Sequence, residues 1–248
     1  MNDVYVLIAV RMKSSRLKKK ALIDIYSEPL LKRLINRMEE NFPLERIIVC
    51  TSTNEQDDAI ESFCVANGYR LFRGHELDVM KRFLDASSVF KASTIIRVTG
   101  DNPLTDSETM IDMINFHIEN SSEYTYTSDL PIGTRPEIID VGALRRIHGQ
   151  LRNTESSEYM TFMLMRPEYL KVSEYKCKNP KIVRPNISLT VDTIEDLELI
   201  RFIYKSFNGV LPSLENILLF LEKNPDQIIY VNNSSVLPSD IDCSYYDD

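Results

Sequence analysis

Six basic side chains fall within ten residues of one predicted loop: Arg11, Lys13, Arg16, Lys18, Lys19 and Lys20. The whole chain carries a net charge of −8, so this local excess of positive charge stands out. A loop of this kind can bind phosphate through backbone N–H groups, basic side chains and hydroxyl groups such as those of Ser14 and Ser15. The alternative is a solvated run of charges, which is what most such runs are.

Two aspartates, Asp101 and Asp192, follow shortly after predicted buried strands over residues 94–98 and 187–191. Carboxylates at neighbouring strand ends can share one hard divalent cation, and phosphate oxygens then complete its coordination shell. Each aspartate alone has a structural alternative, as a turn residue or as a helix cap. Together, and opposite the basic loop, they predict a metal site for a triphosphate.

The chemistry of such a site follows from its charges. Arg11, Arg16 and Lys20 would neutralise the charge that builds on departing pyrophosphate. The metal would hold the α-phosphate in line with the attacking oxygen. We therefore predict Arg11, Lys20 and Asp101 as catalytic residues, and Asp101 and Asp192 as metal ligands.

Other common sites find no support in the sequence. There is no GxxxxGK[ST] segment and no GxGxxG segment, and no Ser-His-Asp arrangement can be read from the spacing. The acidic balance argues against nucleic-acid binding. Four scattered cysteines and the absence of a signal-peptide layout predict a cytoplasmic protein, and no apolar run is long enough to span a bilayer.

The elements that must position these residues alternate between strand and helix. Apolar runs predict strands over residues 4–10, 46–50, 70–72 and 94–98, and apolar residues at helical spacing follow each of them. This alternation predicts a parallel sheet with helices on both faces and ligands at the carboxyl ends of the strands. The residues at these ends are predicted nucleotide contacts: Arg11, Ser14, Ser15, Arg16, Lys20, Thr51, Ser52, Arg73 and Gly100.

The second half of the chain has a less regular pattern. Strands are predicted over residues 124–126, 137–141, 169–175 and 187–191, and helices over residues 143–151, 157–165 and 213–223. Another helix is predicted to be capped by Asp192 or Thr193, with an apolar face of Leu197, Ile200, Ile203 and Tyr204. We predict one α/β domain over residues 1–231, with a nucleotide-binding half (1–120) and an acceptor and possible dimerisation half (121–231). From residue 232 to 248 the tail is polar, and no order is predicted for it.

Several motifs together resemble the cytidylyltransferases of the acylneuraminate and 3-deoxy-manno-octulosonate class, and most of all their SpsF-like branch. The loop supplies Arg11, Ser15, Arg16, Leu17 and Lys20 in the spacing typical of that class. Further matches follow in the family's order: Phe72-Arg73-Gly74, Asp78-Val79, Arg82-Phe83, residues 98–103, residues 191–193 and Glu195-Asp196-Leu197.

The resemblance implies a three-layer α/β/α fold of the nucleotide-diphosphosugar transferase type (GT-A-like), with a mostly parallel mixed sheet. It implies transfer of CMP from CTP to a small anionic sugar or sugar-like acid, with Mg²⁺ as cofactor and release of pyrophosphate, for surface glycan synthesis. Such enzymes are commonly homodimers. By position, Arg73 would lie near the nucleotide, and Gly133, Arg135, Glu137 and Glu158 would bind the acceptor.

The chain also departs from the family pattern. Lys13 stands where the family loop usually has Gly, and Lys18-Lys19 stand where it has Pro-Gly. Arg135 stands where an acidic residue is usual, and we expect it either to bind an anionic group on the acceptor or to be an exposed loop residue. Two other functions remain open: a GT-A-type glycosyltransferase, although Asp101-Asn102-Pro103 lacks the second Asp of its metal motif, and a non-catalytic nucleotide-binding relative.

Overall fold

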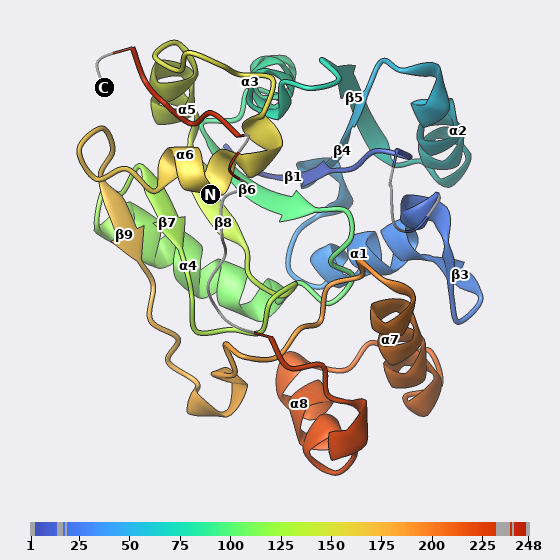
Figure 1. The fold of residues 1–248 in the computed structure, drawn as a ribbon. Coiled ribbons are helices and arrows are strands. Elements are labelled where there is room, and N and C mark those ends of the chain that lie inside the picture. Colours follow the sequence, from blue (N-terminus) through green and yellow to red (C-terminus); the bar gives the residue numbers. More distant parts are fainter. Residues whose placement is uncertain (1–2, 14–16, 18, 232–238, 240, 247–248) are drawn as a thin grey trace.

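A single mostly parallel sheet forms the centre of the protein (Figure 1). The structure is a computed structural model and describes residues 3–13, 17, 19–231, 239 and 241–246. Over these residues the strand order is β5-β4-β1-β6-β8-β7-β9. The strands are β1 (Val4–Ala9), β4 (Ile47–Ser52), β5 (Arg70–Gly74), β6 (Thr94–Thr99), β7 (Tyr124–Tyr126), β8 (Glu137–Asp140) and β9 (Val172–Glu174).

The first four strands of this sheet are all parallel, with β1 between β4 and β6. Strand β8 then runs antiparallel to β6 and to β7, and β9 is parallel to β7. Because parallel strands deliver their carboxyl ends to one edge, the loops after β1, β4, β5 and β6 meet there. The alternation predicted for the first half of the chain is confirmed.

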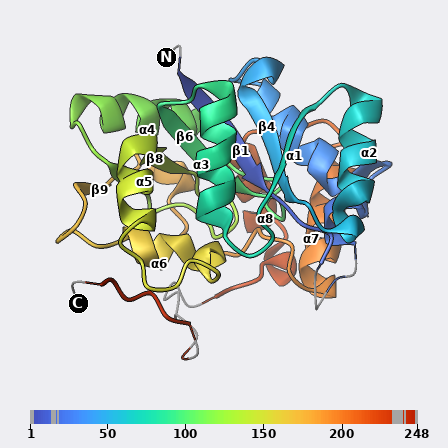
Figure 2. The ribbon, with the colours of Figure 1, turned by 90° about the horizontal axis from the view of Figure 1, so that it is seen from above.

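Helices cover both faces of the sheet, as the sequence predicted. One face of β1 places Val6 and Ile8 against α1 (Leu30–Glu39), α2 (Asp58–Asn67) and α4 (Ser107–Glu119). The other face places Leu7 against α3 (Val79–Phe90), α5 (Val141–His148) and α6 (Met160–Leu164). Alternate residues of a strand point to opposite faces, which gives these two cores and the three-layer fold. Figure 2 shows α3 and α5 side by side across one face.

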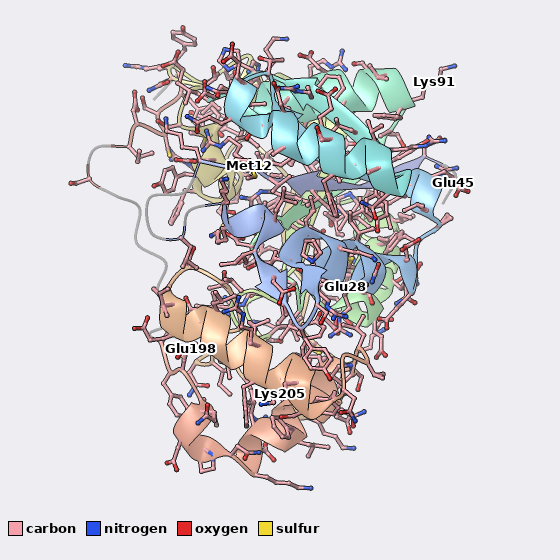
Figure 3. The ribbon with its side chains drawn as sticks, turned by 90° about the vertical axis from the view of Figure 1, so that its right-hand side faces the viewer. Met12, Glu28, Glu45, Lys91, Glu198 and Lys205 are labelled. Carbon is pink, nitrogen blue, oxygen red and sulfur yellow. The ribbon has the colours of Figure 1, made fainter. Side chains whose placement is uncertain are left out.

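A third apolar core lies below the sheet in Figure 1. It joins α7 (Ile194–Ser206) and α8 (Leu214–Glu222) to a two-stranded antiparallel hairpin, β2 (Asp24–Ile25) and β3 (Glu28–Pro29). Figure 3 shows Glu198 and Lys205 on α7, beneath the hairpin that carries Glu28. None of the helices in the described part of the chain is long and apolar enough to cross a membrane.

Two expectations from the sequence are wrong. Residues 187–191 form no strand of the main sheet but an extended segment, in which Leu189 N–H donates to the Ile132 carbonyl at 2.7 Å. The end of the chain is ordered at Tyr245, which is fully buried and stacks on Tyr169 with 4.2 Å between ring centroids. Figures 1 and 2 show this segment beside α6.

Helix α7 begins with a capping box that confirms the predicted cap. The Thr193 hydroxyl accepts from the Asp196 N–H at 3.3 Å, and the Asp196 carboxylate accepts from the Thr193 N–H at 2.8 Å. We expect Thr193→Ala to lower the free energy of unfolding by about 1 kcal/mol, because a helix N–H loses its partner. Urea denaturation of Thr193→Ala and of the hydroxyl-retaining Thr193→Ser tests this. Equal losses in the two variants would contradict it.

Candidate active site

A cleft of about 610 Å³ opens where the carboxyl ends of β1 and β6 meet the start of α3. This volume is in the range of sites for small molecules. The cleft receives side chains from both halves of the chain. The lining residues are Ala9, Val10, Arg11, Lys13, Lys20, Ala21, Leu77, Val79, Arg82, Arg97, Thr99, Gly100, Asp101, Glu158, Tyr159 and Asp192.

Lys20, Asp101 and Asp192 meet in this cleft. The Lys20 Nζ atom donates to Asp101 Oδ2 and to Asp192 Oδ1, each at 2.9 Å. Because both oxygens contact one ammonium group, they lie within twice that distance of each other. Burial acts to lower the pKa of Lys20, but the two carboxylates outweigh it and raise the pKa. The ammonium is therefore charged at neutral pH, between two carboxylates.

The backbone explains why two distant aspartates converge. Asp101 follows β6 after Gly100, whose N–H donates to the Ala9 carbonyl at 2.8 Å. A Cβ atom at position 100 would lie 2.6 Å from the Val10 side chain, so only glycine fits there. The Val191 N–H donates to the Asp101 carbonyl at 3.0 Å, and this bond brings the next residue to the same place.

Lys20 begins a short 3₁₀ helix, Lys20–Leu22. The preceding Lys19 has φ 56° and ψ 29°, which is the left-handed conformation. A non-glycine residue pays a steric penalty there of about 1 kcal/mol or more. This steric penalty is a physical reason for the glycine that is usual at this position in the cytidylyltransferases that the sequence resembles. In this protein the same left-handed turn forms with lysine.

Arg11 connects the two halves of the chain across the cleft. Its Nη2 atom donates to the Glu158 carboxylate at 2.6 Å and its Nη1 atom to the Glu76 carbonyl at 3.1 Å. The Glu158 side chain is 49% exposed, so the ion pair contributes little to stability and can exchange for another anion. Arg11 is thus held in the cleft by contacts that a phosphate group could replace.

The donor set of the site suits Mg²⁺. Asp101 and Asp192 supply hard carboxylate oxygens close together, and Mg²⁺ is commonly bound by one or two carboxylates with substrate phosphates and water. Among the described residues there is no group of three or more His, Cys, Asp or Glu side chains that could enclose a metal. A metal here would need ligands from a bound substrate.

Three of the predicted nucleotide contacts do not line the cleft. Thr51 and Ser52 are fully buried, and the Ser52 hydroxyl donates to the Asp57 carboxylate. Arg73 donates from Nε to the Ser52 carbonyl at 2.9 Å and pairs with Glu61. Ser52 and Arg73 thus hold the loop after β4 in place through internal partners. The Thr51 hydroxyl is buried without a hydrogen-bond partner in the described structure. The predicted contacts Ser14, Ser15 and Arg16 lie outside the described residues.

Two predicted acceptor contacts also lie away from the cleft. Gly133 has φ 87°, and a Cβ atom there would lie 2.3 Å from the Thr190 backbone nitrogen, so this glycine allows two chain segments to pack closely. Arg135 donates from Nε to the Leu130 carbonyl at 2.7 Å and from Nη2 to the Pro185 carbonyl at 3.2 Å. The structure does not bring Arg135 to the cleft.

The other two predicted acceptor contacts lie at or beneath the cleft. Glu158 lines it, whereas Glu137 is only 8% exposed and pairs with Arg97. Arg97 was not among the predicted site residues, and Arg82 had no predicted role. An arginine within the apolar β6 strand was the available signal, because a charged residue in a buried strand needs a partner or a ligand.

Arg82 is a buried part of the cleft wall. It is 1% exposed, and it donates to the His75 carbonyl at 2.8 Å and to the Glu76 carbonyl at 2.8 Å. Burial lowers the pKa of this guanidinium group. These bonds fix the loop that carries Leu77 into the cleft lining.

Asp78 ties the Glu158–Tyr159 wall to α3. Its carboxylate accepts from the Lys81 N–H at 2.8 Å and the Ser157 hydroxyl at 3.1 Å, and contacts His148 Nε2 at 2.7 Å. Burial acts to raise the pKa of Asp78, but the hydrogen bonds from His148 and the Lys81 amide outweigh it and lower the pKa.

This network predicts a pH-dependent stability. A depressed pKa contributes stability above the unfolded value of 3.8, and that contribution is lost as the pH falls through the folded value. We expect Asp78→Asn to lower the free energy of unfolding by about 1–3 kcal/mol at pH 7 and by less below pH 3.8. Denaturant titrations of both proteins at several pH values check this, and a difference that is constant down to acid pH would contradict it.

Comparison with known proteins gives consistent matches over both halves of the chain. A family model described as cytidylyltransferase matches residues 5–219. The spore coat polysaccharide biosynthesis protein SpsF of Bacillus subtilis is 33% identical over 233 residues, which cover 91% of this chain and 97% of that protein. A 3-deoxy-manno-octulosonate cytidylyltransferase of Neisseria meningitidis is 26% identical over 159 residues, 62% of this chain and 60% of that protein. A solved cytidylyltransferase from Leptospira borgpetersenii superposes with a TM-score of 0.83 at 26% identity, covering 95% of this chain and 99% of that one.

Proposed function

The chain belongs to the cytidylyltransferase family and is a CTP-dependent nucleotidyltransferase, and from this premise we propose that it transfers CMP from CTP to a small anionic sugar or sugar-like acid. The observation that carries the proposal is the contact of Lys20 with both Asp101 and Asp192 within the cleft. The names of two relatives, one for spore coat polysaccharide biosynthesis and one for a sugar-acid cytidylyltransferase, support an acceptor of this class and a role in surface glycan synthesis.

In the proposed reaction an acceptor oxygen attacks the α-phosphorus of CTP. The bond from that phosphorus to the bridging oxygen breaks, pyrophosphate leaves, and the acceptor proton passes to solvent. No covalent enzyme intermediate is needed, because the acceptor itself is the nucleophile. The residues only have to orient the two substrates and offset the negative charge that moves to pyrophosphate.

Different residues of the cleft would orient the substrates and offset the charge. Asp101 and Asp192 would hold Mg²⁺, which as a Lewis acid polarises the phosphoryl oxygens. Lys20 would move from the carboxylates to the phosphates, where its ammonium charge would offset the charge of departing pyrophosphate. Arg11 would exchange Glu158 for a phosphate oxygen.

We also propose that the enzyme is a homodimer, as similar enzymes commonly are. Sedimentation analysis can measure this oligomeric state.

The proposal is tested by measuring pyrophosphate release from CTP with Mg²⁺ in the presence of a panel of acceptors. The panel includes 3-deoxy-manno-octulosonate, an acylneuraminate and phosphorylated sugars, and ATP, GTP and UTP serve as nucleotide controls. We expect release that requires both CTP and one class of acceptor, together with a CMP-acceptor product in the mass spectrum. Pyrophosphate release with no acceptor dependence, or none with any acceptor, would contradict the proposal.

A further inference from the structure

The floor of the cleft carries the side chains of Arg97 and Thr99 on β6 and of Asp101 in the turn that follows the strand. Arg97, Thr99 and Asp101 are two residues apart, and all three line the cleft. Alternate residues of a strand share a face, so Arg97 and Thr99 point to the same side of β6. The Asn102 N–H donates to the Thr99 carbonyl at 3.1 Å, which closes the turn that carries Asp101. The guanidinium group of Arg97 therefore lies along the same floor as the proposed reaction centre at Asp101.

A buried platform fixes this guanidinium group. Arg97 Nη1 pairs with the Glu137 carboxylate and donates to the Thr161 hydroxyl at 3.0 Å. The same carboxylate accepts from the Thr161 hydroxyl at 2.7 Å and from the Tyr124 hydroxyl at 2.5 Å. Burial acts against both charges, yet the pair raises the pKa of Arg97 and lowers that of Glu137. Both groups are charged at neutral pH and hold a single arrangement.

The platform uses only one side of the arginine. A guanidinium group has five N–H donors in a planar fork. In the described structure the Nε atom of Arg97 is buried without a partner, and Nη2 donates only to the Glu158 carbonyl, at 3.3 Å. Nε and Nη2 form the side edge of the fork, which matches the two oxygens of an oxyanion. A buried donor without a partner calls for an explanation.

We propose that the Nε–Nη2 edge of Arg97 binds the carboxylate or phosphate group of the acceptor, which makes Arg97 the residue that selects an anionic acceptor. The assignment rests on the proposed function, since it places the reacting oxygen of that acceptor near Asp101. Glu137, Tyr124 and Thr161 are positioning residues that act through Arg97. The Glu158–Tyr159 segment supplies the facing wall.

Kinetics of Arg97→Met and Arg97→Lys test the assignment. For the best acid acceptor of the panel, we expect Arg97→Met to lower kcat/KM by about 30–100-fold, since a charge-assisted hydrogen bond is lost. The KM for CTP should change by less than about threefold, which is our threshold for an unaltered nucleotide site. The preference for the acid over its uncharged amide or dephosphorylated counterpart should fall to about one. If the variant loses its preference for the acid over the amide, the bound group is a carboxylate. If it loses its preference for the phosphorylated over the dephosphorylated acceptor, the bound group is a phosphate.

Arg37→Met is a matched control outside the cleft. Arg37 is another buried guanidinium, 2% exposed, whose Nε atom also lacks a partner in the described structure. It donates from Nη1 to the Pro212 carbonyl at 2.7 Å. We expect Arg37→Met to destabilise the fold without changing acceptor preference. Equal acceptor kinetics in the Arg97 and Arg37 variants would show that Arg97 is only structural and would overturn the assignment.

A binding measurement separates this assignment from the proposed function. In the ¹⁵N-labelled wild type, the Nε–H signal of Arg97 is identified by its absence in Arg97→Lys. We expect this signal to shift on titration with 3-deoxy-manno-octulosonate or inorganic phosphate in the presence of Mg²⁺ and CMP. No shift with either probe would overturn the assignment even if the enzyme turns over. A shift without pyrophosphate release from any acceptor would support the anion site and reject the proposed function.

Discussion

Replacing Asp101 with asparagine is expected to lower kcat by about 1000-fold, because the proposed metal ion would lose one of two anionic ligands and the transition state several kcal/mol of stabilisation. Asparagine keeps the size and shape of the side chain, so the cleft itself should be preserved. Residual activity should need a higher Mg²⁺ concentration for half-saturation. Measurement of kcat as a function of Mg²⁺ concentration tests both expectations.

Asp112→Asn provides the control for this substitution. Asp112 lies on α4, away from the cleft lining, and accepts a hydrogen bond from the Tyr175 hydroxyl at 3.1 Å. We expect this variant to keep kcat and its Mg²⁺ dependence. If Asp101→Asn retained kcat within tenfold of the wild type at the same Mg²⁺ concentration, Asp101 would not be a metal ligand.

Replacing Lys20 with methionine is the second substitution with a large expected effect. Methionine keeps most of the side-chain length but removes the charge that would face departing pyrophosphate. Removing one preorganised donor of this kind costs about 100–1000-fold in kcat. Lys19→Met is a matched control, since Lys19 is the exposed neighbour in the same loop and contacts neither aspartate through a described bond. Steady-state kinetics with saturating CTP should show the loss only at position 20, and similar losses in both variants would contradict the role of Lys20.

The convergence of Lys20, Asp101 and Asp192 could be anticipated from the sequence because it follows from chain topology. Parallel strands end at one edge of a sheet, and the apolar runs mark where the strands end. However, the prediction that a strand of the sheet precedes Asp192 was wrong. An extended segment bonded to the Asp101 carbonyl, rather than a strand of the sheet, brings it there.

The partners of long side chains could not be anticipated in the same way. Arg135 and Arg73 donate to backbone carbonyls of other loops, up to 50 residues away in the chain. The local sequence pattern does not predict which carbonyl a guanidinium group will reach. The pair between Arg97 and Glu137 joins strands that are 40 residues apart in the chain. Tyr245 shows the same limit, because a polar tail gave no sign that one of its aromatic rings would be buried.

The most direct test of the proposed metal site is a crystal structure of the protein with Mg²⁺ and a non-hydrolysable analogue of CTP. We expect a metal ion bound to the carboxylates of Asp101 and Asp192 and to phosphate oxygens, with Lys20 Nζ moved onto the phosphates. A triphosphate that binds elsewhere, or a metal ion that contacts neither aspartate, would contradict it.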